Sequence, residues 1–117
     1  LRVIHELMQT NTQLIANRQA WTDSAKRNKI EQIALLLKGA LRGEKMVGIK
    51  MNVPKEKMEE VIGMLPSLNA PTVAPLYQSS WFSVEIVVKS EVVRDLIPEL
   101  IEHGAEGIIE YPLNKVI

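Results

Sequence analysis

Apolar and polar residues alternate along two stretches of the chain, 46–54 and 81–89. Because side chains of a strand point to opposite faces in turn, this pattern predicts two strands with one buried face each. Two shorter stretches, 71–77 and 107–113, are rich in β-branched and aromatic residues and contain prolines, which favour strand edges and ends. We therefore predict four strands.

Apolar residues recur at spacings of three and four in segments 23–43, 55–65 and 91–103. This is the period of an amphipathic helix, so we predict three helices. Pro98 lies inside the last of them and is expected to remove one backbone hydrogen bond and bend the helix. Thr22 or Asp23 is a suitable N-cap for the first helix.

Residues 2–17 show short apolar bursts without a sustained period. We predict one or two strands or extended segments there. The methionines at 46, 51, 58 and 64 accompany the first strand and the helix after it, where they are expected to fill the core.

From residue 46 onward the predicted order is β-α-β-β-α-β. Two β-α-β units joined by a hairpin, with right-handed crossovers, give a ferredoxin-like α+β fold: a four-stranded antiparallel sheet with two helices on one face. The helix of 23–43 and the extended segment would precede this domain. The other sheet face is left open, so we expect it to pack on another subunit, another sheet or a ligand.

Composition narrows the classes of function. The 117 residues carry 14 basic and 14 acidic side chains, so no long-range field attracts nucleic acid or a membrane, although a local charged patch is still allowed. The absence of cysteine excludes disulfides, thiolate nucleophiles and zinc-thiolate sites. The apolar runs are too short to span a membrane. The chain begins at Leu1 without an initiating methionine, which is compatible with a fragment.

No motif of a known catalytic centre is present. The glycine patterns of nucleotide-binding loops and of serine hydrolases are missing, and Glu59 and Glu60 would point about 100° apart on a helix. His103 with Glu106 offers too few ligands for a metal, so a structural role is favoured over a metal or anion sensor. Trp81 and Phe82 lack the basic residues of an RNA-binding sheet.

Small and polar residues gather where the predicted strands begin and end. Asn52 closes the first strand, 68–72 opens the second, and 104–107 leads into the last. These segments are candidates for the rim of one pocket, in which Asn52 and Thr72 would supply hydrogen bonds. Ordinary loop chemistry explains the same residues without a ligand, and the pattern alone leaves both explanations open.

In combination, several segments resemble the C-terminal part of the long-form ATP phosphoribosyltransferase family, and the match covers nearly the whole chain. They are L-I-A-N at 14–17 with Trp21, I-E-Q-I-A-L-L-L-K-G-A-L at 30–41, M-N-V-P at 51–54, A-P-T-V-A-P-L at 70–76 and G-A-E-G-I-I-E-Y-P-L-N-K at 104–115. Enzymes of this family join ATP to phosphoribosyl pyrophosphate, with magnesium, in the first step of histidine biosynthesis. Their catalytic cleft lies between two N-terminal domains, and a third, ferredoxin-like domain binds histidine as feedback inhibitor and helps build a hexamer.

The resemblance implies that 1–45 is the tail of the second catalytic domain plus a connecting helix and that 46–117 is the regulatory domain of a cytoplasmic enzyme. It implies that this fragment is not catalytic, holds no magnesium, and leaves ATP and phosphoribosyl pyrophosphate to the missing domains. The histidine site that it implies consists of Asn52, Leu68, Ala70, Thr72, Ala105 and Gly107. The competing hypothesis is a purely structural assembly domain that binds no effector.

Overall fold

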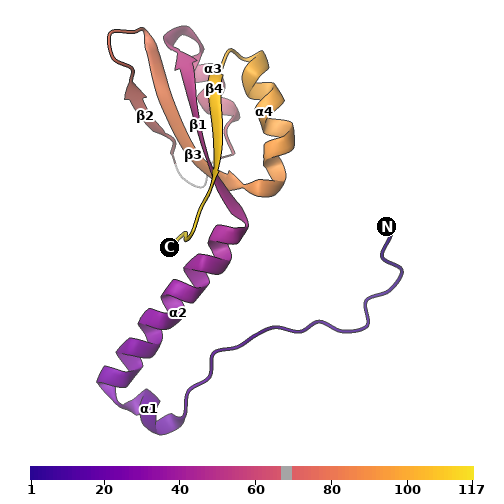
Figure 1. The fold of residues 1–117 in the computed structure, drawn as a ribbon, viewed down its shortest axis with the longest axis vertical. Helices are drawn as coiled ribbons and strands as arrows, with labels where there is room; N and C mark the ends of the chain where they lie inside the picture. Colours follow the sequence, from indigo (N-terminus) through magenta and orange to yellow (C-terminus); the bar gives the residue numbers. More distant parts are fainter. Residues whose placement is uncertain (67–69) are drawn as a thin grey trace. The chain divides into compact units, whose positions relative to one another are not determined.

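The computed structural model describes residues 1–66 and 70–117 (Figure 1). By their contacts these residues divide into two units, Leu1–Leu35 and Leu36–Ile117, which are treated separately below.

The first unit is largely an extended chain followed by helix. Residues 1–17 have no regular secondary structure, so the strands predicted as one alternative for 2–17 are wrong, and the extended alternative holds. The apolar side chains of this segment are exposed, Leu7 to 91%, and none of the strands in the described part of the chain pairs with it. A short helix that the sequence pattern missed, α1 (Arg18–Thr22), comes next.

Side-chain caps start both helices of this region. Asn17 Oδ1 accepts a hydrogen bond of 2.7 Å from the Ala20 amide at the beginning of α1. Asp23 Oδ1 accepts from the amides of Ala25 and Lys26, at 3.0 and 3.2 Å, at the beginning of α2 (Ser24–Glu44). Of the two predicted caps Asp23 is therefore confirmed, because it satisfies backbone donors that a helix start leaves free. The prediction of Thr22 as the N-cap is wrong, since Thr22 is the last residue of α1.

The second unit contains a four-stranded antiparallel sheet, and all four predicted strands are confirmed. The strands are β1 (Met46–Pro54), β2 (Thr72–Pro75), β3 (Trp81–Lys89) and β4 (Glu106–Pro112). Their spatial order is β2-β3-β1-β4, with β1 in the interior and β2 and β4 at the edges. This order is that of the ferredoxin-like α+β fold, as predicted.

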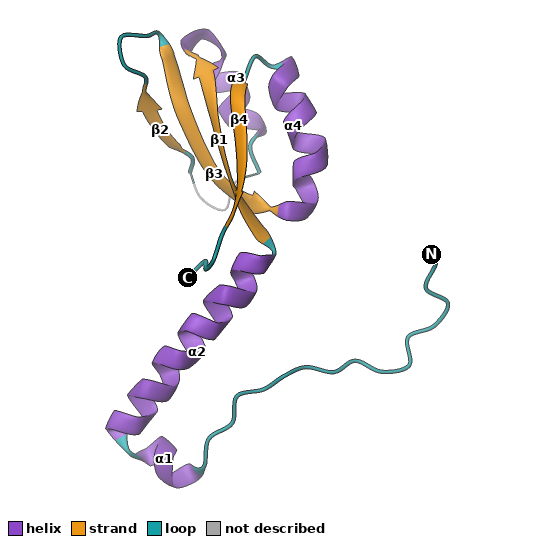
Figure 2. Ribbon diagram, viewed as in Figure 1, coloured by secondary structure: helices purple, strands orange, loops and turns teal. Residues whose placement is uncertain are grey.

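Two helices cover one face of this sheet, as Figure 2 shows. They are α3 (Met58–Met64), entered through the 3-10 turn η1 (Lys55–Lys57), and α4 (Val93–Glu102), entered through η2 (Ser90–Val92). The helix pattern of 55–65 and 91–103 is thus confirmed. Pro98 is exposed, and α4 continues past it to Glu102.

The core lies between the sheet and the two helices. Alternate residues of the interior strands are buried on this side, and Val61 and Leu100 of the helices pack against them. The fully buried larger side chains are Ile49, Met51, Val53, Val61, Val84, Val88 and Leu100. The four methionines take the predicted places, since two are buried and Met58 and Met64 pack against the core.

On the open face of the sheet, Tyr111 lies across the neighbouring strand. Tyr111 of β4 is the register partner of Gly48 on β1, and its hydroxyl donates a hydrogen bond to the Glu85 carboxylate on β3. A side chain on Gly48 would overlap the tyrosine ring. The glycine therefore leaves the space through which the ring reaches the third strand.

Titration of Tyr111 should report this contact. The hydrogen bond to Glu85, burial, and the Glu85 charge raise the pKa of Tyr111 from 10.0 to about 12. Because the folded-state pKa is the higher one, the contact stabilises the fold fully below about pH 10 and its contribution is lost as the pH rises toward about 12. We expect Tyr111→Phe to remove the latest phenolic transition in an ultraviolet titration. An unchanged transition would contradict the assignment.

The last turns of α2 contact the C-terminal segment of the chain. The Val116 amide donates a hydrogen bond of 2.9 Å to the Gly39 carbonyl. A Cβ on Gly43 would lie only 3.0 Å from the Leu113 carbonyl oxygen, so the buried glycines allow this close approach. The end of α2 and the start of β1 are thereby held in one unit with the sheet.

Candidate functional site

Asn52 and Gly107, two of the predicted site residues, lie side by side. Asn52 is the register partner of Ser83 on β3 and of Glu106 on β4. Between Lys50 and Asn52 the register with β4 shifts, so β4 carries an extra residue at this point. Gly107 adopts a φ of +59°, and a Cβ built on it would lie 3.3 Å from Asn52 Nδ2. The bulge therefore places a residue without a side chain directly beside the asparagine amide.

The Asn52 side chain lies on the open face of the sheet. It is half-buried, and among hydrogen bonds between described residues none involves its side chain. The half-buried Ser83 and the exposed Glu106 are its register partners on either side. An amide, a hydroxyl and a carboxylate can together accept hydrogen bonds from a cationic or imidazole group. Ser83 and Glu106 were not predicted as candidates, because only the strand register shows that they flank Asn52.

Ala105 serves the core. Its exposed fraction is 3%, and its amide donates a hydrogen bond of 2.9 Å to the Leu100 carbonyl at the end of α4. Gly104, with a φ of +90°, makes the turn between them possible. Ala105 thus fixes where β4 begins, and hence where Glu106 and Gly107 stand.

The remaining predicted residues lie at the opposite edge of the sheet. Thr72 begins β2 and pairs with Glu85 of β3, and the exposed Ala70 precedes it. Because β3 lies between β1 and β2, Thr72 and Asn52 are separated by roughly 10 Å across the strands. Leu68 lies outside the described residues. The structure therefore places Gly107 beside Asn52, whereas Ala105 is buried in the core and Thr72 lies on the other side of β3.

Gly107→Ala should destabilise the second unit by about 1–2 kcal/mol, since a residue with a Cβ is strained in the left-handed region. Gly63→Ala is the matched control, because a Cβ there meets nothing within 4 Å and alanine favours the helix. The midpoint of denaturant unfolding should fall for Gly107→Ala, and it should rise or remain unchanged for Gly63→Ala. Equal midpoints for Gly107→Ala and the parent would contradict the conformation described.

His103 links the two helices. Its Nδ1 lies 2.7 Å from the Glu99 carbonyl oxygen and its Nε2 lies 3.5 Å from Glu60 Oε1. Lys57 Nζ donates to the other Glu60 oxygen at 3.0 Å, and this bond, with smaller help from the Lys57 and His103 charges, lowers the pKa of Glu60. These contacts agree with the structural role expected for His103. Within the described ranges no three histidine or acidic side chains come together as a metal site.

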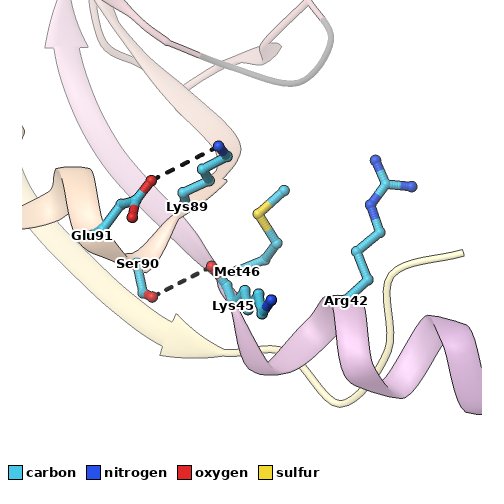
Figure 3. Close-up of a pocket in the computed structure, with 6 residues that line it drawn as sticks. All are labelled: Arg42, Lys45, Met46, Lys89, Ser90 and Glu91. Carbon is cyan, nitrogen blue, oxygen red and sulfur yellow. Dashed lines mark hydrogen bonds and ion pairs between the residues drawn. The ribbon is translucent and has the colours of Figure 1, made fainter. Parts of the chain in front are cut away.

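A hollow of about 690 Å³ lies at the other end of the sheet, where β1 begins and β3 ends (Figure 3). None of the residues predicted as a site lies in its lining. The lining residues are Arg42, Lys45, Met46, Lys89, Ser90 and Glu91. The sequence pattern does not indicate this hollow, since Lys45 and Lys89 are far apart along the chain and only the pairing of Met46 with Lys89 brings them together.

None of the helices in the described part of the chain has the length and hydrophobicity of a membrane span.

The strand order and the two helices define a ferredoxin-like α+β domain, and comparison with known proteins shows which kind. Residues 43–115 match the family described as "HisG, C-terminal domain", and the chain belongs to that family. All 117 residues align with the ATP phosphoribosyltransferases of Desulfosudis oleivorans, at 72% identity, and Desulfatibacillum aliphaticivorans, at 67%. ATP phosphoribosyltransferase 1 of Geobacter sulfurreducens is 53% identical over the same length. The chain spans 40% of the length of each of these relatives.

Proposed function

We propose that this chain is the regulatory and assembly portion of an ATP phosphoribosyltransferase and that it binds histidine as feedback inhibitor. The observation that carries the proposal is the match of residues 43–115 to the C-terminal domain family, together with 72% identity to an ATP phosphoribosyltransferase along the whole chain. The longer protein would join ATP to phosphoribosyl pyrophosphate in the cytoplasm, in the first step of histidine biosynthesis.

Catalysis is assigned to the rest of that longer protein. Residues 1–45 would be the tail of its second domain and 46–117 its regulatory domain. This chain alone would then be inactive.

The region around Asn52, where β1 pairs with the edge strand β4, suits histidine as a ligand. The Asn52 amide can donate to or accept from an imidazole, and the Glu106 carboxylate can accept from the ligand's ammonium group. Gly107 leaves room for the ligand backbone beside Asn52. Because asparagine carries no charge, it binds imidazole by hydrogen bonding without an ion pair to imidazolium.

Thr72 would join this site through a second copy of the chain. In one copy Thr72 and Asn52 lie on either side of β3, which a ligand of histidine's size does not readily bridge. Since β2 and β4 are the two edges of the sheet, the β2 edge of one copy can approach the β4 edge of another. The proposed hexamer would thus complete the site, and histidine would stabilise the quaternary state that favours its binding.

A chimera tests the proposal. This chain replaces the matching 40% of the Desulfosudis oleivorans enzyme, and histidine inhibition of the chimera is measured. We expect inhibition by histidine that Asn52→Lys and Thr72→Gln each weaken about tenfold or more, while Asn28→Lys, the same change at an exposed position of α2, leaves it unaltered. Undiminished inhibition in both site variants would sink the assignment.

The second candidate is an assembly domain without effector. It is favoured by the apolar side chains on the open sheet face, where Ile109 is 57% exposed beside Tyr111. It predicts a chimera that assembles as the parent does and whose activity histidine does not alter.

A further inference from the structure

The hollow at the start of β1 collects positive charge from three parts of the fold. Arg42 lies in the last turn of α2, Lys45 directly precedes β1, and Lys89 ends β3. The antiparallel pairing of Met46 with Lys89 brings these segments together. In the view of Figure 3 the Met46 side chain lies between those of Lys89 and Arg42. The lining therefore combines three cationic side chains with one apolar side chain.

The charges of this rim are not balanced internally. Glu91 is the one carboxylate of the lining, and it faces Lys89 at 3.8 Å with side chains 73% and 67% exposed. Such an exposed pair contributes little and is readily exchanged for another anion. Among the described residues Arg42 and Lys45 form no ion pair within 4.0 Å. A chain with zero formal net charge thus carries a local cationic excess here.

The base of the hollow is fixed. The Lys45 carbonyl oxygen accepts hydrogen bonds from the Ser90 amide at 3.0 Å and from its hydroxyl at 3.3 Å. These bonds tie the start of β1 to the end of β3, and Met46 is only 6% exposed. The backbone that carries the cations is therefore held in place before any ligand arrives, which reduces the ordering cost of binding.

We propose that this hollow binds a small polyanion with two or more linked phosphoryl groups. Its volume of about 690 Å³ falls within the usual range of small-molecule sites. The three cations come from α2, the start of β1 and the end of β3, and a linked chain of phosphoryl groups offers more charged oxygens to them than a single phosphate does. Arginine binds phosphoryl oxygens in a planar fork and lysine binds them as a point charge.

This site is separate from the proposed histidine site and goes beyond the proposed function. Met46 and Asn52 lie six positions apart on β1, which corresponds to about 20 Å at roughly 3.3 Å per residue. Ligands at the two places can therefore be titrated independently on the same protein.

The test is a titration of the 117-residue chain with inorganic diphosphate at low ionic strength, followed by calorimetry and by amide shifts of Met46 and Lys89. We expect saturable binding that Arg42→Gln or Lys45→Gln weakens about two- to fivefold each. Glu91→Gln should tighten binding by a similar factor, because it removes the competing carboxylate. Lys55→Gln, an equal charge change on η1, should leave the affinity unchanged.

Several results would overturn the proposal. One is the absence of saturable binding at millimolar diphosphate, and another is equal weakening by Lys55→Gln and Arg42→Gln, which would show attraction to overall charge only. Orthophosphate binding as tightly as diphosphate, or a poly-glutamate peptide binding where diphosphate does not, would reject a linked phosphate ligand. A histidine titration of the same samples distinguishes these results from failure of the proposed function. That titration follows the amide shifts of Asn52 and Gly107, which do not line the hollow.

Discussion

Leu100→Ala is expected to lower the free energy of unfolding of the second unit by about 3 kcal/mol, within the range of roughly 2–5 kcal/mol for buried leucines. The Leu100 side chain is fully buried between α4 and the sheet, so its removal leaves a cavity. Its carbonyl also accepts the Ala105 hydrogen bond that fixes the start of β4. Denaturant unfolding monitored by circular dichroism measures the change.

Ile101→Ala is the control for this variant. Ile101 is the next residue of α4 and is 60% exposed, so the same kind of truncation removes little buried surface. We expect a change within about 0.5 kcal/mol, as for most surface substitutions. If both variants unfolded at the same denaturant concentration, the burial pattern of α4 described here would be wrong.

Gly48→Ala is expected to cost about 2 kcal/mol, in the range of substitutions that overfill a packed site. The new methyl group would overlap the Tyr111 ring, which must leave the sheet face and give up its bond to Glu85. The edge strand β4 would lose a cross-strand contact next to the proposed ligand edge. Thermal or denaturant unfolding of the variant measures the loss.

A double-mutant cycle isolates the cause. In a Tyr111→Ala background the obstacle is absent, so Gly48→Ala should be neutral or stabilise the fold by up to about 1 kcal/mol, because alanine is favoured over glycine inside a strand. An equal cost in both backgrounds would mean that something other than the tyrosine ring occupies the space above Gly48.

The sheet and its helices could be predicted because each element has a regular period of burial. Residues 46–54 alternate because one face of β1 meets the helices, and 91–103 repeat at helical spacing because Val93, Leu96 and Leu100 share one buried face. The segment 2–17 could not be predicted in the same way, since its apolar side chains are exposed and show no period of burial. The helix α1 is a single short turn started by Asn17, too brief to show a period.

The site could be predicted only in part. Strand ends identified Asn52 and the glycine-rich turn at 104–107, and the structure places Asn52 and Gly107 in contact. The bulge that makes this contact depends on register, which a hydrophobic pattern does not contain. Strand order likewise decides that β3 separates Asn52 from Thr72. The cationic hollow was missed for the same reason, because the pairing of β1 with β3 assembles it.

The most direct test of the central proposal is a titration of the 117-residue chain with L-histidine, followed residue by residue through backbone amide shifts. We predict saturable shifts at Asn52 and Gly107, a shift at Thr72 through a neighbouring copy of the chain, none at Met46 or Lys89, and loss of the response in Asn52→Lys. D-histidine serves as the control for specific recognition and should shift these amides far less. Absence of any saturable shift up to millimolar histidine, or shifts that map elsewhere, would contradict a histidine-binding regulatory domain.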